Sequence, residues 1–165
     1  MREDEVYRAS KKWFVDQEFQ LLAGQPPRGT DRLPVVEIKA PNGKGKGSLG
    51  SFKPDLIVAN SNVVLIVECK PRYDKGDVEK LLSIRDDLRR LDALVSELRQ
   101  RRLFERRGLG EFYPSSESIR SSVRYAVSYE GTPEVGDEIY SLVFEEGSSM
   151  MGSLYRGLMP ISSIV

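Results

Sequence analysis

The chain has 165 residues, with 25 basic and 25 acidic side chains, one cysteine and no histidine. The missing histidine excludes histidine-dependent nucleophilic catalysis and a histidine-ligated zinc, and a single cysteine excludes an internal disulfide and a cysteine-rich metal site. Any catalysis must therefore use carboxylates and lysines, and we expect a metal ion to assist them.

The length corresponds to about one domain, so we treat residues 1–165 as a single unit. No run approaches the ~18 apolar residues of a membrane span, so we expect no membrane partner and a cytoplasmic location. The zero net charge hides an asymmetry, because residues 108–165 carry three basic and eight acidic side chains, which leaves 22 basic and 17 acidic before them. The basic part favours a nucleic-acid face, although two ordinary solvated surfaces account for the charges equally well.

The first predicted element is a helix over residues 3–23. Val6, Ala9 and Trp13 form one apolar face, and Gly24, with two prolines shortly after it, ends the helix. The first turn is acidic, which is favourable at the positive end of the helix dipole.

A linker and a polar loop follow this helix. Residues 25–34 are rich in proline and glycine, and residues 35–40 are predicted to form a short strand. Residues 41–51 (PNGKGKGSLGS) lack the pattern of a nucleotide-binding loop, so we expect a mobile hairpin loop there. The alternative is a flexible basic finger, in which Lys44 and Lys46 contact phosphate groups.

Two short apolar runs, residues 56–59 and 63–67, come next and are separated by a polar turn. This pattern predicts an antiparallel strand pair. Asp55 opens the first strand and Glu68 closes the second, so the pairing makes them neighbours. Lys70 lies two residues beyond Glu68 and is expected on the same face, because side chains alternate along a strand.

Two adjacent carboxylates need a cation, because like charges side by side are destabilising. Mg²⁺ suits such a place, since it is held by one or two carboxylates and several waters. The alternative is purely structural: Asp55 begins a turn, and Glu68 and Lys70 form a cross-strand pair at a sheet edge. The uninterrupted apolar run before Glu68 is typical of a central strand and favours the first interpretation.

A long helix is predicted over residues 77–106, with Asp77 as its N-cap. Its apolar side chains recur at spacings of three and four residues. A continuous helix of this length projects beyond the domain and implies a homodimer, whereas a helix that covers the sheet and breaks near its middle does not. Both interpretations fit the pattern.

Strand signals return after a loop at residues 108–118. Residues 123–129 are predicted to be a strand rich in β-branched and aromatic side chains, and residues 139–144 a strand or a short helix. The rest of residues 131–165 has no clear pattern and is treated as a C-terminal extension. The order of elements indicates an α/β fold, with a mixed sheet covered by helices.

A Pro-Asp pair ending at Asp55, twelve further residues, and then Glu68, Cys69 and Lys70 resemble the motif of the PD-(D/E)XK nuclease superfamily. The resemblance covers residues 3–130 and implies the restriction-endonuclease-like fold with an αβββαβ core. It also implies that Asp55 and Glu68 bind Mg²⁺ or Mn²⁺ together with the backbone carbonyl of Cys69. Lys70 would then orient, or help to deprotonate, the attacking water.

Many members of this superfamily add a glutamate from the first helix. Here Glu5 is expected in that role, with Glu18 as the runner-up. The chain lacks the glutamine-and-tyrosine helix motif and the cysteine cluster that some branches carry. The lysines expected to contact nucleic-acid phosphates are Lys44, Lys46, Lys53 and Lys80.

The residues and the resemblance together predict a Mg²⁺-dependent endonuclease that hydrolyses phosphodiester bonds in DNA, of the restriction, junction-resolving or mobile-element type. Its expected partners are DNA and a second copy of the chain, paired through residues 77–106. Two alternatives stay open. One is a nuclease-like fold that binds nucleic acid or supports assembly without catalysis, and the other is an endonuclease that cuts RNA, because the predicted site contacts phosphates rather than bases.

Overall fold

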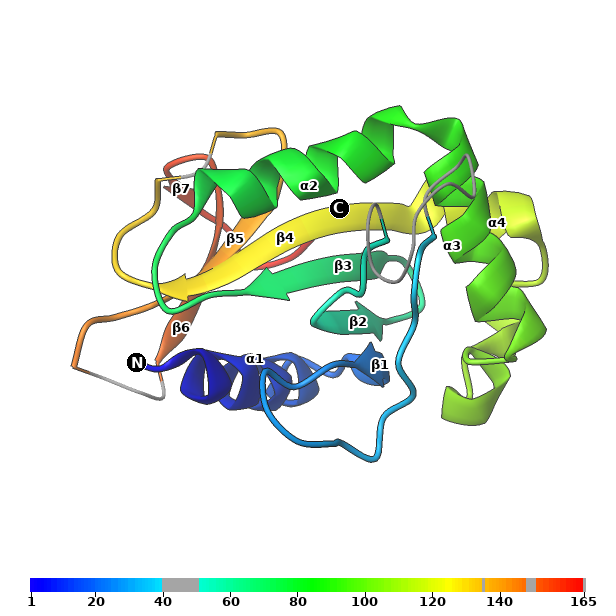
Figure 1. The fold of residues 1–165 in the computed structure, drawn as a ribbon, viewed down its shortest axis with the longest axis horizontal. Helices are drawn as coiled ribbons and strands as arrows, with labels where there is room; N and C mark the ends of the chain where they lie inside the picture. Colours follow the sequence, from blue (N-terminus) through cyan, green and yellow to red (C-terminus); the bar gives the residue numbers. More distant parts are fainter. Residues whose placement is uncertain (40–50, 135, 148–150, 165) are drawn as a thin grey trace.

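The computed structural model describes residues 1–39, 51–134, 136–147 and 151–164 (Figure 1). In these residues seven strands form one sheet, in the order β1 to β7. The strands are β1 (Gln20–Gly24), β2 (Leu56–Ala59), β3 (Val64–Cys69), β4 (Val123–Glu130), β5 (Tyr140–Phe144), β6 (Gly152–Arg156) and β7 (Met159–Pro160). The helices are α1 (Glu3–Asp16), α2 (Lys75–Asp86), α3 (Leu88–Gln100) and α4 (Ser116–Ser122), with short 3-10 turns η1 (Glu105–Arg107) and η2 (Gly110–Phe112).

Strand pairing confirms the predicted α/β architecture with a mixed sheet. β1, β2 and β3 pair antiparallel, β4 and β5 run parallel to β3, and β6 and β7 are antiparallel again. The predicted strand pair is present, with Leu56 opposite Val67. The C-terminal extension supplies β5, β6 and β7, which widen the sheet on the side away from β1. Within the described residues, no helix combines the length and the apolar character needed to cross a membrane.

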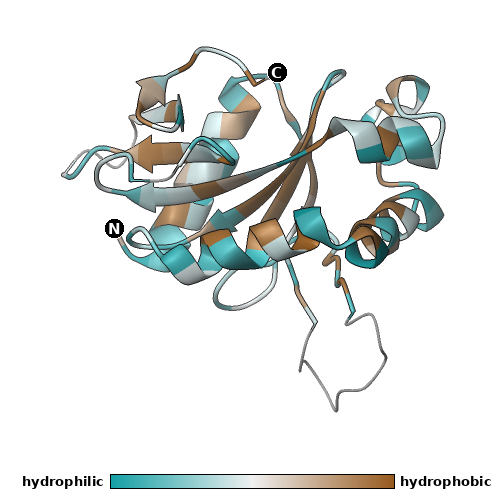
Figure 2. Ribbon diagram, turned by 90° about the horizontal axis from the view of Figure 1, so that it is seen from above, coloured by the Kyte–Doolittle hydropathy of each residue, from teal (hydrophilic) through white to brown (hydrophobic). Residues whose placement is uncertain are grey.

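Helices cover both faces of the sheet and give three layers. α1 packs on one face, where Val6 and Phe14 share a core with Leu65 of β3. The other helices cover the opposite face and one end of the sheet, where Leu81 of α2 shares a core with Ile66. Figure 2 shows the hydrophobic residues gathered in the strands, between the two layers of helices. All of β3 is buried, which explains why residues 64–67 are apolar without alternation and leaves Glu68 as the charged residue near its end.

The first predicted helix is too long. α1 ends at Asp16, and Glu18 adopts a positive φ of 66°, which a continuing helix does not allow. The following residues form β1 instead, and Leu22 and Ala23 are buried because β1 pairs with β2. Pairing with a distant strand therefore overrides the local helical pattern.

Three connecting segments also differ from expectation. Of the strand predicted over residues 35–40, the described residues 35–39 contain one bridge, between Ile38 and Phe52. Most of the loop predicted over residues 41–51 lies outside the described residues. The loop predicted over residues 108–118 contains η2 and the start of α4.

The long helix predicted over residues 77–106 is two helices. α2 and α3 meet at Asp87, whose backbone leaves helical geometry at φ −109° and ψ 102°. The Asp87 carboxylate accepts a hydrogen bond from the backbone N of Arg89 (3.0 Å) and caps α3. The break lets α2 bury Leu81 and Ile84 over the sheet while α3 lies at its end. The interpretation with a break is confirmed, and the pairing of two copies through this segment stays a prediction.

Replacing the residue at this break should weaken α3. We expect Asp87→Ala to lower the free energy of unfolding by about 1 kcal/mol, because it removes the side-chain cap of the helix. Urea unfolding followed by circular dichroism measures the change. Asp86→Ala is the matched control, since the Asp86 carboxylate bonds to Arg85 beside it and caps no helix. Equal losses in the two variants would contradict the capping role.

Candidate functional site

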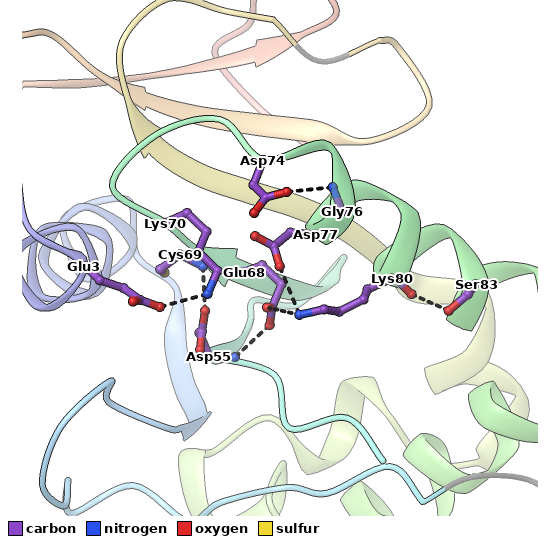
Figure 3. Close-up of polar contacts among 10 residues, drawn as sticks. All are labelled: Glu3, Asp55, Glu68, Cys69, Lys70, Asp74, Gly76, Asp77, Lys80 and Ser83. Atoms are coloured by element: carbon purple, nitrogen blue, oxygen red, sulfur yellow. Dashed lines mark hydrogen bonds and ion pairs between the residues drawn. The ribbon is translucent and has the colours of Figure 1, made fainter. Parts of the chain in front are cut away.

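Asp55 and Glu68 meet at one end of the strand pair, as predicted (Figure 3). The backbone N of Asp55 donates a hydrogen bond to Oε1 of Glu68 (3.2 Å). In return, the backbone N of Cys69 donates to Oδ2 of Asp55 (2.7 Å). Each carboxylate is therefore held by the backbone of the opposite strand, which fixes the spacing of the two acids.

Burial disfavours the ionised form of these two carboxyl groups. Glu68 is only 3% exposed, and Asp55 is partly buried. Desolvation raises the pKa of both carboxyl groups above the ordinary range. The charge of Asp55 raises the pKa of Glu68 further, and the charges of Glu3 and Asp77 act on Asp55 in the same direction. The backbone hydrogen bonds and the nearby lysines oppose these effects only in part.

Lys70 lies one residue beyond β3, and its ammonium is bound by α1. Its Nζ donates to Oε1 of Glu3 at 2.9 Å, whereas Glu68 faces Lys80 of α2. The two side chains therefore have partners on different helices, although alternation predicted one shared face. Burial alone would lower the pKa of Lys70, but the hydrogen bond to Glu3 and the charges of Asp77 and Asp55 raise it overall. Lys70 is held as a charged ammonium.

Glu3, rather than Glu5 or Glu18, is the glutamate of the first helix that reaches the site. The Glu5 carboxylate accepts a hydrogen bond from the backbone N of Arg2 (2.6 Å) and caps its own helix. Glu18 lies beyond the end of α1. A sequence signal did exist for Glu3, because it precedes the buried Val6 by three residues and therefore shares its helix face.

Asp77 is a second acidic residue that sequence reasoning did not assign to the site. It was expected to cap the helix, but Asp74 is the N-cap and accepts from the backbone N of Gly76 (2.7 Å). Asp77 follows in the first turn of α2 and is 3% exposed. Its Oδ1 accepts a hydrogen bond from Nζ of Lys80 (3.0 Å), and the same Nζ lies 3.9 Å from Oε2 of Glu68.

The remaining predicted residues are divided between the site and other places. The Cys69 thiol is buried against Ser10 of α1, with Sγ 3.8 Å from Oγ, so only the backbone of Cys69 belongs to the site. Lys53 is exposed two residues before Asp55. Lys80 donates a hydrogen bond to Asp77 and forms a longer ion pair with Glu68. Lys44 and Lys46 lie outside the described residues.

The fit of a metal ion depends on how many protein ligands it needs. Among the described residues, no group of three or more Asp, Glu, Cys or His side chains is arranged to hold one. Mg²⁺ requires fewer, because waters complete its shell around one or two carboxylates. Asp55 and Glu68 fit that need, and Oδ2 of Asp77 is buried without a hydrogen-bond partner among the described atoms. Lys70 and Lys80 compensate the charge of these carboxylates only in part.

The raised pKa values predict a pH effect on stability. A carboxyl group whose pKa is higher in the folded than in the unfolded protein favours folding at low pH, and this contribution is lost as pH rises through the folded pKa. With a chelator present, we expect the free energy of unfolding to fall between about pH 5 and about pH 8. Glu68→Gln should flatten this slope and stabilise the protein at the upper pH by about 1 to 3 kcal/mol.

Denaturant unfolding across this pH range provides the measurement. Glu79→Gln is the control, because Glu79 is an exposed acid of α2 paired with Lys75. If the Gln variant of Glu68 kept the wild-type slope, the buried carboxylate would not be the cause.

Comparison with known proteins identified no relative of this chain. No family model matches the chain, and neither a curated protein nor a solved structure matches it. The likeness to the PD-(D/E)XK superfamily therefore stays an expectation from the sequence motif.

Proposed function

We propose that the protein is a metal-dependent endonuclease that hydrolyses phosphodiester bonds in DNA. The observation that carries the proposal is the pairing of Asp55 with Glu68 at the end of a buried strand pair, with the charged Lys70 beside them. In the described residues, this is where carboxylates and lysines gather in the pattern that phosphodiester hydrolysis needs. No histidine exists to provide another catalytic system.

The order of elements supports the same proposal. A helix, three antiparallel strands, a helical segment and a strand parallel to the third strand follow one another from α1 to β4. This is the order that an αβββαβ core of the restriction-endonuclease type requires. α2, α3 and α4 stand where that core needs one crossover helix, and β5 to β7 are additions at the far side of the sheet.

Each residue of the site has a role that its surroundings support. Asp55 and Glu68 would hold Mg²⁺ or Mn²⁺, with the carbonyl of Cys69 as the third ligand that the resemblance implies. When bound, the metal supplies neutralising charge for the phosphate and a water of lowered pKa. Lys70 orients the attacking water or the phosphate as a hydrogen-bond donor, because its raised pKa opposes the deprotonating role. Glu3 keeps that ammonium charged and in place.

Activity measurements test the central assignment. We expect Asp55→Ala and Lys70→Ala to reduce the cutting of plasmid DNA in Mg²⁺ or Mn²⁺ by about 100-fold or more, since each removes charge stabilisation from the reacting phosphate. Lys12→Ala is the control for a lost lysine, because Lys12 pairs with Asp16 on the exposed side of α1.

Undiminished cutting by the Asp55 and Lys70 variants would remove the assignment. Binding of DNA without cutting by the wild-type protein would favour the non-catalytic nucleic-acid-binding module instead. A matched RNA substrate in the same assay separates the two kinds of endonuclease.

The contact between Glu3 and Lys70 gives a further prediction. Glu3→Gln should lower the rate of cutting by about 10-fold, because residues that orient a catalytic group typically contribute that much. Glu5→Gln should have a smaller effect on the rate, since Glu5 bonds to its own helix terminus. Initial rates at saturating DNA measure both variants. If Glu5→Gln lowered the rate more than Glu3→Gln, Glu5 rather than Glu3 would be the glutamate of the site.

A further inference from the structure

The ammonium of Lys80 lies between two buried carboxylates from different elements. Its Nζ is 3.0 Å from Oδ1 of Asp77 on α2 and 3.9 Å from Oε2 of Glu68 on β3. Both acidic side chains are 4% exposed, whereas the Lys80 side chain is 54% exposed. The half-exposed Lys80 side chain thus brings a single positive charge to two nearly buried carboxylates (Figure 3).

This single charge does not satisfy the acids. Oδ2 of Asp77 is buried and has no hydrogen-bond partner among the described atoms. The 3.9 Å separation from Glu68 is too long for a hydrogen bond. A buried carboxylate oxygen without a hydrogen-bond donor costs folding free energy. The two acids therefore need more positive charge than Lys80 supplies, and Oδ2 of Asp77 needs a donor.

We propose that Asp77 binds the cation at Asp55 and Glu68 through its bound waters rather than as a third direct ligand, which agrees with the absence of a three-acid group among the described residues. In the same proposal Lys80 is a built-in competitor, which leaves when a divalent cation binds. The inference rests on the proposed cation site at Asp55 and Glu68, but it does not require DNA cleavage. A divalent ion would bring two charges where the ammonium brings one, and its bound waters would supply the donors that Oδ2 of Asp77 lacks among the described atoms. Lys80 can turn toward solvent because its side chain is half exposed, and in doing so it gives up the contact of Nζ with the Phe52 ring (5.9 Å to the centroid).

A purely structural ion pair within α2 makes a different prediction. If the Asp77–Lys80 pair only stabilised the first turn of the helix, removing Lys80 would leave cation binding unchanged or weaken it through loss of order. If Lys80 competes with the cation, removing it strengthens binding. The sign of the change therefore separates the two explanations.

Calorimetric titration of the intact chain with MnCl₂, without nucleic acid, measures this sign. We expect Lys80→Met to tighten Mn²⁺ binding by about 3- to 10-fold, because the apolar stem is kept and the competing charge is removed. Asp77→Asn should weaken binding by about 10-fold. Lys75→Met is the control, since Lys75 pairs with the exposed Glu79 on the same helix. Thermal unfolding of each apo variant verifies that it is folded.

The outcomes distinguish this inference from the proposed function. Unchanged or weaker binding in Lys80→Met overturns the competitor role, and this variant decides the matter even if Asp77→Asn does not fold. Binding that depends on Asp55 and Glu68 but not on Asp77 overturns the inference and leaves the proposed function standing. No Mn²⁺ binding by the wild-type chain removes the inference and the metal-dependent function together.

Discussion

Burial of two carboxylates at the C-terminal end of β3 is the constraint on which the rest of the site depends. β3 lies between β2 and β4 with helices over both faces, so the side chain at its end has little access to water. Glu68 stands at this position, and the register of β2 brings Asp55 beside it. Acids in such a place raise one another's pKa unless positive charge is close. The surrounding residues reflect that need.

Positive charge reaches the carboxylates from two directions, each time as one half of an ion pair. Lys70 is bound by Glu3 of α1, on one side of the sheet. Lys80 is bound by Asp77 of α2, on the other side. Each helix thus contributes an acid that positions a lysine near the central pair. These contacts keep both lysines charged, which suits the binding of a phosphate but leaves the central acids short of compensating charge.

The rest of the fold serves to hold these parts in place. α1 and α2 can present Glu3 and Asp77 to the same strand ends because they cover opposite faces of one sheet. The break at Asp87 keeps α2 short enough to lie over the sheet, and α3 then packs at its end. β5 to β7 extend the sheet on the far side of β4, and their contribution to the proposed site is structural.

The sequence by itself determined the strand pair and the meeting of Asp55 with Glu68. Both depend on local information, because a polar turn between two apolar runs sets the pairing and the pairing sets the neighbours. The α/β class followed from the order of elements in the same way. The central position of β3 could also be predicted from the sequence, since an apolar run without alternation requires cover on both faces of the sheet.

Only the tertiary structure decided which other residues join this pair. Whether Glu3 or Glu5 faces the site depends on how α1 is rotated on the sheet, and its acidic first turn offers both. Asp77 and Asp74 are equally suited to cap a helix, and the packing of α2 against β3 buries one of them. β1 was hidden because its partner β2 lies more than thirty residues away in the sequence. Packing and distant pairing are long-range effects that no short stretch of sequence records, and for the rotation of α1 the spacing of Glu3 to Val6 is the one local signal.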